Sequence, residues 1–269
     1  MVFNASRLLG KTVLVTGSSA GIGKATAILF AKAGSNVILL ARRAEALAEV
    51  KQACIEAHKA SNLQEGGQFA AIPFDVSDRV AIGNLFSLIP TSLRNIDILV
   101  NNAGFVVGRD SVGDLDEKVV ESMFATNVLG LISLTNLFVK DFKTRGTGHI
   151  INLGSVAGRE PYAGGSIYTA TKHAVNAFTA SMMRELINTP IRVTEIQPGM
   201  VETEFSLVRF KGDADAAKAV YAGMEPLTGE DIAEEIVWAA SRPPHVNIAE
   251  TLIFPVNQAS ATTFYRAPA

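Results

Sequence analysis

Short, mostly apolar runs alternate along the whole chain with longer segments of helical pattern. The strand-like runs comprise residues 12–16, 36–41, 69–74, 97–100, 149–153, 191–196 and 251–254. An apolar run without polar alternation is typical of a strand buried on both faces, as in a parallel sheet covered by helices. The alternation therefore predicts an α/β fold of the doubly wound type, with a parallel sheet and helices on both faces.

Size and composition favour a single domain over residues 1–269. Hydrophobic residues make up 48% of the chain, enough for a large core, and a net charge of −2 argues against binding to nucleic acid or an anionic membrane surface. No run approaches about 18 uninterrupted apolar residues, and residues 1–11 lack the apolar core of a signal peptide, so we expect no membrane association. Cys54 is the only cysteine, which favours a reducing, cytoplasmic setting. We expect no metal site.

A glycine-rich turn follows the first strand-like run. It reads Gly17-Ser18-Ser19-Ala20-Gly21-Ile22-Gly23, and a helical pattern follows it up to Ala33. Backbone N–H groups and the dipole of a helix starting here would face an anion, so the turn predicts a site for the phosphates of a dinucleotide. Its spacing, G-x-x-x-G-x-G, differs from the G-x-G-x-x-G of many dinucleotide-binding folds. The alternative is that the glycines only form the turn.

Two arginines, Arg42 and Arg43, follow the second strand-like run. Many NAD-binding sites have an acidic residue there, which binds the 2′-hydroxyl of the ribose. A guanidinium suits a phosphate instead, so the pair predicts NADP(H) as the cofactor. The alternative, a solvated basic start of the next helix, is weaker because cations at a helix N-terminus are slightly unfavourable.

The third and fourth strand-like runs end in residues with two possible uses. After the third run, Asp75 either contacts the adenine amino group or closes the strand, and Val76 follows it. After the fourth, Ala103 and Gly104 let the backbone approach a ligand closely, whereas Asn102 either contacts the ribose or ties strand edges together. We expect all five residues to belong to the cofactor site.

Residues 155–172 carry the pattern of a proton-transfer site. If residues 166–188 form one helix, Tyr168 and Lys172 lie on one face, one turn apart. A fixed ammonium near a phenol favours the phenolate and lowers its pKa. The hydroxyl of Ser155 could then hydrogen-bond the oxygen that gains or loses a proton while a hydride moves at its carbon. Taken alone, the Tyr–Lys pair could also be an ordinary amphipathic pair.

Three further polar positions have different expected roles. Residues 116–125 and 128–144 have helical patterns on either side of Thr126 and Asn127, and the polar Asn127 predicts a kink or a buried water site. His149 is expected at the surface, at the start of a strand, rather than as a catalytic base. The segment of about residues 200–225 contains Thr203 and Arg209 and has the features of a lid.

Taken together, these motifs resemble the short-chain dehydrogenase/reductase family over nearly the whole chain. The matching residues are Thr16-Gly17-x-x-x-Gly21-Ile22-Gly23, Asn101-Asn102-Ala103-Gly104, Asn127, Ser155, Tyr168, Lys172, Pro198, Gly199 and Thr203. The resemblance implies about seven parallel strands, a cofactor half over about residues 10–150 and a catalytic and substrate half over about residues 150–269. It also implies that Tyr168 is the acid/base, that Lys172 lowers its pKa and binds ribose, and that Ser155 orients the carbonyl. Asn127 would hold a proton-relay water, and Pro198, Gly199, Val201 and Thr203 would lie beside the nicotinamide.

A narrower resemblance concerns the substrate. Residues 201–212 and 251–258 are similar to those of the NADP-dependent 3-hydroxy acid dehydrogenases, which oxidise L-allo-threonine, serine and 3-hydroxy acids such as 3-hydroxyisobutyrate, interconvert 3-hydroxypropionate and malonic semialdehyde, and are typically cytoplasmic homotetramers. A broad reductase of neutral ketones and aldehydes is the alternative enzyme, and a catalytically silent NADP(H)-binding module is an alternative of another class. A substrate carboxylate would need a cation in a partly dry pocket, and we predict Arg209 for this role, with Arg159 second.

Overall fold

All seven strand-like runs form strands of one parallel sheet. A computed structural model describes residues 5–267, and the strand order across the sheet is β3-β2-β1-β4-β5-β6-β7. The strands are β1 (Thr12–Thr16), β2 (Asn36–Ala41), β3 (Phe69–Pro73), β4 (Ile98–Asn101), β5 (Gly148–Leu153), β6 (Ile191–Pro198) and β7 (Glu250–Ile253). The order reverses between β1 and β4, which places a crevice at the carboxyl ends of these two strands.

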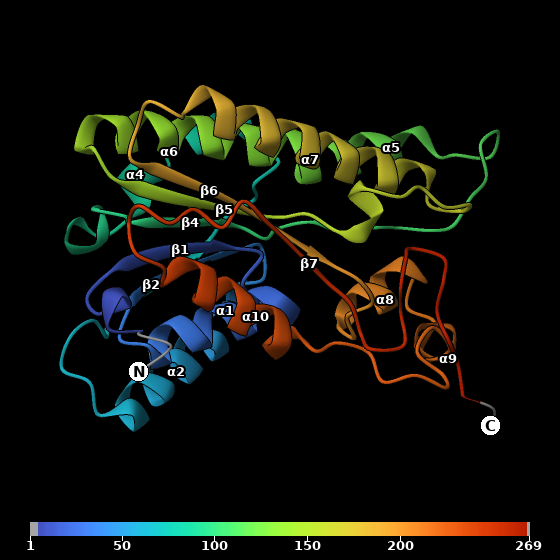
Figure 1. Cartoon of the computed structure of the whole chain (residues 1–269), viewed down its shortest axis with the longest axis horizontal. Helices are drawn as coiled ribbons and strands as arrows, with labels where there is room; N and C mark the ends of the chain where they lie inside the picture. Colours follow the sequence, from blue (N-terminus) through green and yellow to red (C-terminus); the bar gives the residue numbers. More distant parts are fainter. Residues whose placement is uncertain (1–4, 268–269) are drawn as a thin grey trace.

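Helices cover both faces of this sheet (Figure 1). The α-helices are α1 (Gly21–Lys32), α2 (Ala44–Ser61), α3 (Arg79–Gly83), α4 (Leu85–Leu88), α5 (Glu117–Phe124), α6 (Leu131–Arg145), α7 (Ser166–Glu185), α8 (Glu204–Arg209), α9 (Ala214–Ala219) and α10 (Gly229–Ala240). Shorter turns of 3-10 helix are η1 (Ala5–Leu8), η2 (Thr91–Leu93) and η4 (Val156–Gly158), and η3 (Ala125–Gly130) is a π-helix. Helices α1, α2 and α10 lie on one face, and α5, α6 and α7 lie on the other. The predicted doubly wound fold is therefore confirmed.

The central strands are apolar because both of their faces are covered. Every residue of β1, β2 and β5 is buried. Val13 and Val15 of β1 pack with Phe30 of α1 in the core on one face, whereas Leu14 packs with Phe138 of α6 in the core on the other. This alternation of neighbouring side chains between two cores explains why β1 carries no polar face.

A chain of hydrogen-bonded, buried polar side chains joins strands β4 and β5 to helices α6 and α7. Asn101 of β4 donates through Nδ2 to Thr135 Oγ1 of α6 and to Asn152 Oδ1 of β5, at 2.9 Å each. Asn152 donates in turn to Thr179 Oγ1 of α7 at 2.8 Å, and Thr179 donates to the carbonyl of Val175. Because Ser155 follows β5 and Tyr168 lies on α7, these bonds help to position the strand and the helix that carry the predicted catalytic groups.

Two predictions near the ends of β5 and β6 were wrong. His149 is buried, because β5 lies between β4 and β6, and its Nε2 lies 2.8 Å from Thr194 Oγ1. Burial and the neighbouring Arg192 hold the pKa of His149 below its usual range. The strand-like run 191–196 is also too short, since β6 continues through Pro198, which pairs only with β7. The N–H that proline lacks is not needed there, because Gly199 donates to the carbonyl of Ile253.

The two helices predicted over residues 116–125 and 128–144 form one continuous helical stretch in the structure. It runs from α5 through the π-helix η3 into α6, and by length and composition alone the stretch Glu117–Arg145 could cross a membrane. In this fold Phe138 and Phe142 are fully buried in the core beside the sheet. Core packing therefore accounts for the apolar character of this stretch.

The predicted lid segment contains two short helices, α8 and α9. They lie beyond the carboxyl ends of the strands, at one end of the molecule beside the C-terminal segment (Figure 1). Helix α8 begins directly after Thr203, and α9 covers Ala214–Ala219.

Replacement of Asn152 by alanine should destabilise the fold. The change removes an acceptor from Asn101 and a donor from Thr179 in the interior, and each buried group that loses its partner costs about 1–3 kcal/mol. Urea unfolding should therefore give a lower transition midpoint for Asn152→Ala than for the native protein. The exposed Ser87→Ala, which also loses one hydrogen bond, is the matched control and should shift the free energy of unfolding by less than about 0.5 kcal/mol. Equal midpoints for the two variants would contradict this account.

Candidate active site

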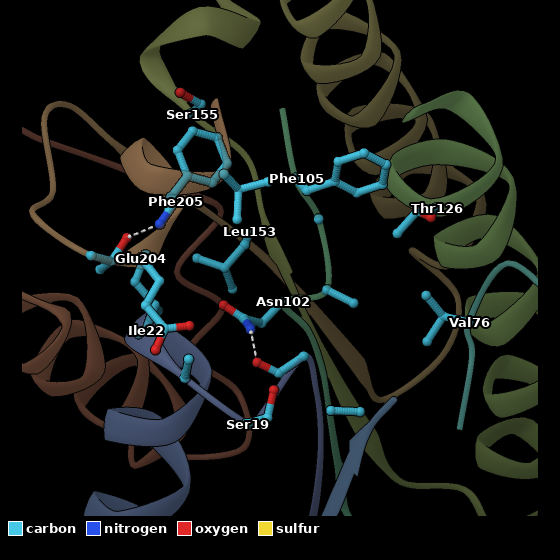
Figure 2. A pocket seen from close by; sticks show the side chains of 18 of the residues that line it. Ser19, Ile22, Val76, Asn102, Phe105, Thr126, Leu153, Ser155, Glu204 and Phe205 are labelled. Carbon is cyan, nitrogen blue, oxygen red and sulfur yellow. Dashed lines mark hydrogen bonds between the residues drawn. The ribbon is translucent and has the colours of Figure 1, made fainter. Parts of the chain in front are cut away.

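One cavity collects most of the predicted site residues. It has a volume of about 690 Å³ and lies at the carboxyl ends of the central strands (Figure 2). The predicted residues that line it are Gly17, Ser19, Gly21, Ile22, Arg42, Arg43, Asp75, Val76, Asn102, Ala103, Gly104, Ser155, Tyr168, Lys172, Pro198, Gly199, Val201 and Thr203. Five other predicted residues do not line it, namely Ser18, Gly23, Asn127, Arg159 and Arg209.

The glycine turn lies directly against the end of β4. Gly17 and Gly21 have φ angles of +63° and +51°, a region that favours glycine. At Gly23 a Cβ atom would lie 2.4 Å from Asn102 Nδ2 and from the carbonyl oxygen of Gly17, so any side chain there would force the turn away from β4. Asn102 Nδ2 donates to the carbonyls of Thr16 (2.8 Å) and Gly17 (3.2 Å), and Figure 2 draws one of these bonds. The strand-tying role of Asn102 is therefore present in the structure, and its side chain also reaches the cavity.

The basic end of the cavity is formed by Arg42 and Arg43. Both side chains are exposed, and Arg43 donates through Nε and Nη2 to Ser19 Oγ at 3.3 and 3.2 Å. The Nη2 atom of Arg43 also forms a 3.1 Å ion pair with Glu204 Oε2. The donors of the turn and these two guanidiniums lie in one cavity, so the residues fit a dinucleotide that carries a 2′-phosphate.

Asp75 closes the turn directly after β3, which is one of the two roles predicted for it. Its Oδ1 accepts from the backbone N–H of Ser77 (2.9 Å) and from the Ser77 hydroxyl (2.7 Å). Asp75 and Val76 also line the cavity, so the adenine contact stays a prediction.

Helix α7 brings Tyr168 and Lys172 to the cavity from one face, as the i, i+4 spacing predicts. Lys172 Nζ donates to the carbonyl of Leu153 at 2.7 Å and lies 5.9 Å from the centroid of the Tyr168 ring. Ser155 Oγ accepts from the N–H of Ala157 and so caps η4, directly after β5. All three predicted groups therefore lie at the carboxyl end of β5, where the strand holds Ser155 and the helix holds the other two.

The protonation of Tyr168 differs from the sequence expectation. Burial raises the pKa of Tyr168 above its ordinary value, and the neighbouring phenol of Tyr162 acts in the same direction. Interactions with the Ser155 hydroxyl and with the charge of Arg209 lower the pKa of Tyr168 but do not outweigh burial. In this structure the phenol, not the phenolate, is the favoured form, so the expected lowering of this pKa by Lys172 is not found.

Burial also lowers the pKa of Lys172, and the buried carboxylate of Glu195 opposes this shift. Desolvation lowers the pKa of Lys172 to about 8, and the charge of Glu195 acts in the opposite direction. Glu195 is buried on β6 and accepts a 3.1 Å hydrogen bond from Asn176 Nδ2, one helical turn after Lys172 on α7. Its other oxygen packs against Gly154, where a Cβ atom would lie 2.2 Å away. Glu195 is therefore a site-supporting group that the sequence analysis missed, because only the fold places it beneath the cavity wall.

Asn127 lies in the π-helix η3 and binds protein groups. Its Oδ1 accepts from the N–H of Phe105 (3.0 Å), and its Nδ2 donates to the carbonyl of Phe105 (2.9 Å) and to Thr171 Oγ1 (3.3 Å). The polar residue thus coincides with a local change from α-helix to π-helix, and the expected kink stays a prediction. Asn127 ties the loop after β4 to α7, and its predicted role in holding a relay water stays a prediction.

Aromatic residues that the sequence analysis missed complete the wall near Tyr168. Phe205 of α8 packs edge-on against the Tyr168 ring, with 5.5 Å between centroids, and Phe105 also lines the cavity. In Figure 2, Phe205 and Glu204 lie on the side of the cavity opposite Val76 and Thr126. Phe205 lies two residues after Thr203 in the predicted lid, and this position could have indicated from the sequence that Phe205 lines the cavity.

The two candidate ligands for a substrate carboxylate have protein partners. Arg209 donates to Tyr162 OH and to the Gly164 carbonyl, at 3.3 Å each, and its Nε is buried without a hydrogen-bond partner among residues 5–267. Arg159 instead donates to Gln197 and pairs with Glu250. The charge of Arg209 still reaches Tyr168, whose pKa it lowers. Of the two, Arg209 is the cation near the Tyr168 phenol.

Comparisons with known proteins agree with this geometry. A family model described as short chain dehydrogenase matches residues 11–213. An NADP-dependent 3-hydroxy acid dehydrogenase from Schizosaccharomyces pombe is 44% identical over 267 residues, 98% of this chain and 100% of the relative. A serine 3-dehydrogenase from Rhizobium radiobacter is 39% identical over 250 residues, 93% of this chain and 96% of the relative. A solved structure, described as the closed form of serine dehydrogenase complexed with NADP+, has a TM-score of 0.86 at 39% identity and covers 96% of this chain and 100% of its own.

Replacement of Lys172 by methionine should change how stability depends on pH. The pKa of Lys172 is about 8 in the folded protein, below the value of about 10.4 expected in the unfolded chain, so the folded state loses this proton first as pH rises. The native protein should therefore gain stability with rising pH between about 8 and 10.4, and Lys172→Met should lack this gain. Urea unfolding at pH 7.5 and pH 10 should show the native protein gaining about 2 kcal/mol relative to the variant. An unchanged difference between the two proteins would contradict the buried, destabilised ammonium.

Proposed function

Because this chain belongs to the short chain dehydrogenase family, we propose that it is an NADP-dependent oxidoreductase acting on 3-hydroxy acids or β-hydroxy amino acids. It transfers a hydride between the nicotinamide and the hydroxyl carbon of substrates such as serine, L-allo-threonine, 3-hydroxyisobutyrate or 3-hydroxypropionate. One observation carries the proposal: Ser155, Tyr168 and Lys172 line the same cavity as the glycine turn and the arginine pair. The names of the relatives from Schizosaccharomyces pombe and Rhizobium radiobacter support the substrate class.

The cofactor would lie along this cavity from the arginines to the nicotinamide-side loop. Backbone groups of the turn from Gly17 to Gly23 would hold the diphosphate, and Arg42 and Arg43 would hold the 2′-phosphate. The remaining predicted residues would contact the adenine, the riboses and the nicotinamide, and they are Asp75, Val76, Asn102, Ala103, Gly104, Tyr168, Lys172, Pro198, Gly199, Val201 and Thr203. When bound, NADP(H) accepts or supplies the hydride.

Tyr168 is the group that moves the proton. Because burial keeps its phenol protonated, Tyr168 is suited to give a proton to a carbonyl oxygen during reduction and to take it back during oxidation. Ser155 orients the reacting oxygen by a hydrogen bond. Lys172, fixed by the Leu153 carbonyl, stabilises the phenolate that remains after proton transfer and binds the ribose. Asn127 keeps the loop and α7 in place through its bonds to Phe105 and Thr171.

A broad carbonyl reductase is the second candidate, and the wall near the lid favours it. Phe105, Val107, Phe205 and Val208 line the cavity on the lid side, and such a wall would accept a neutral ketone. The two enzymes differ in whether a substrate carboxylate is bound. An NADP-coupled rate screen with serine, L-allo-threonine, 3-hydroxyisobutyrate and a neutral secondary alcohol separates them. Markedly higher kcat/KM for the charged substrates supports the first candidate, and the opposite order supports the second.

The assembly is proposed to be a cytoplasmic homotetramer with two-fold axes. The segment from Glu250 onward exposes Leu252, Val256, Phe264 and Tyr265, and an apolar surface of this kind is more often an interface than free surface. Light scattering at micromolar protein should give four times the chain mass of 28.5 kDa. A monomer mass would refute the tetramer.

Replacement of Tyr168 by phenylalanine should remove turnover but not cofactor binding. The ring and its packing against Phe205 stay, whereas the group that transfers the proton is lost. The rate with serine or 3-hydroxyisobutyrate should fall by about 100- to 10,000-fold or more. NADPH binding, followed by fluorescence titration, should stay within a few-fold. Tyr265→Phe, which removes an exposed phenol, is the control, and near-normal turnover of Tyr168→Phe would overturn the mechanism.

Replacement of Arg209 by glutamine should weaken the binding of charged substrates only. If Arg209 holds the substrate carboxylate, losing this charge-assisted bond should raise KM for serine or 3-hydroxyisobutyrate by about tenfold or more. The KM of a neutral secondary alcohol should change little. Arg159→Gln is the matched control, because Arg159 pairs with Glu250 outside the cavity wall. Should Arg209→Gln impair both substrate classes alike, Arg209 only holds the lid to Tyr162 and Gly164.

A further inference from the structure

The side chain of Arg43 joins three parts of the cavity that are far apart in the sequence. Its guanidinium donates to Ser19 in the glycine turn, and its Nη2 pairs at 3.1 Å with Glu204, the first residue of α8. Arg43 itself directly precedes α2 and occupies its N-cap position, without a capping hydrogen bond from its side chain. All three residues line the cavity, and Ser19 and Glu204 are labelled in Figure 2. The nitrogen that pairs with the lid is therefore a nitrogen proposed to bind the 2′-phosphate.

The start of the lid also rests on the glycine turn. Thr203 caps α8 by accepting from the N–H of Phe205, and a Cβ atom placed on Gly21 would lie 3.2 Å from Thr203 Cβ. The Arg43–Glu204 pair thus lies near a place where Thr203 closely approaches the glycine turn. Breaking the ion pair would remove a link between Arg43 and the first residue of α8.

Two anions cannot share one guanidinium nitrogen without cost. Glu204 and Arg43 are both more than half exposed, at 59% and 55% for their side chains, so their ion pair is weak. A 2′-phosphate carries more negative charge than a carboxylate and offers more acceptor oxygens, and it binds the fork of an arginine well. A phosphate on Arg43 would therefore displace the carboxylate, which would otherwise stand beside it as a like charge.

We propose that Glu204 competes with the 2′-phosphate of the cofactor for Arg43, so that binding of the phosphorylated cofactor releases the first turn of α8. The proposal rests on the proposed function, in which Arg43 binds this phosphate. Glu204 is then a specificity-determining residue that weakens binding of NADP(H) and leaves NAD(H) unaffected. Glu204 also makes the attachment of the lid, which carries Phe205 and Arg209, depend on whether the bound cofactor has a 2′-phosphate.

Calorimetric titration with two cofactor fragments tests the competition. The probes are 2′-phospho-ADP-ribose and ADP-ribose, which differ only in the phosphate. Glu204→Gln should bind the phosphorylated fragment about two- to fivefold more tightly than the native protein and leave ADP-ribose binding unchanged. Glu202→Gln removes the same charge from the same segment and forms no ion pair with Arg43 within residues 5–267, so it should change neither affinity. An equal gain for both fragments, or no gain, would overturn the proposal.

Variants of Arg43 separate this proposal from the cofactor assignment on which it rests. Arg43→Ala should weaken the phosphorylated fragment selectively, and adding Glu204→Gln in that background should have no further effect. If Arg43→Ala weakens both fragments equally, the phosphate assignment fails. Suppose instead that Arg43→Ala is selective but that Glu204→Gln still strengthens binding of the phosphorylated fragment when added to Arg43→Ala. The phosphate assignment then stands, and the competition for Arg43 is refuted.

Hydrogen exchange provides the readout for the lid. In the native protein, 2′-phospho-ADP-ribose should speed amide exchange in residues 204–210, whereas ADP-ribose should not. Glu204→Gln should exchange faster than the native protein before any fragment is added, and Glu202→Gln should not. Identical exchange of this segment with the two fragments would refute the release of α8.

Discussion

The hydrogen-bonded joint between the ends of β1 and β4 is the constraint on which the site depends. The Thr16 hydroxyl accepts from the backbone N–H groups of Asn102 and Ala103 and donates to the carbonyl of Val100. The side-chain amide of Asn102 donates two hydrogen bonds, to the carbonyls of Thr16 and Gly17. Because Gly23 has no side chain, the first turn of α1 can lie close to this amide. This joint fixes the glycine turn relative to the central strands, and both the turn and Asn102 line the cavity.

The sequence identified the elements well because the strands and the reactive residues depend on local patterns. Tyr168 and Lys172 share a face whenever their segment is helical, and strand ends in a parallel sheet meet at one edge, so Ser155 reaches them. The prediction for His149 failed because its burial depends on the strands on either side. The protonation of Tyr168 could not be derived from the neighbouring lysine alone, because desolvation depends on the whole fold and outweighs a single charge. Glu195 was missed for the same reason.

Arginines attach the lid at both ends of α8. At the start, Glu204 pairs with Arg43 beside the glycine turn, and at the end Arg209 binds Tyr162 and Gly164, just before α7. Both attachments use a cation that has an anion of cofactor or substrate as its proposed alternative partner. Phe205 lies between the two attachments and packs on Tyr168. The short helix therefore links the two ends of the cavity, which no motif in the sequence connects.

The π-helix η3 has a geometric consequence for the two helices that it joins. A π turn holds one residue more than an α turn, and one residue corresponds to about 100° of rotation about the helix axis. Relative to an unbroken α-helix, the side chains of α5 are therefore turned about the axis with respect to those of α6. The continuous helical stretch can then direct Asn127 toward the loop after β4 while Phe138 and Phe142 stay in the core beside the sheet. Deleting one residue from this turn would restore a regular helix and put these two requirements out of phase.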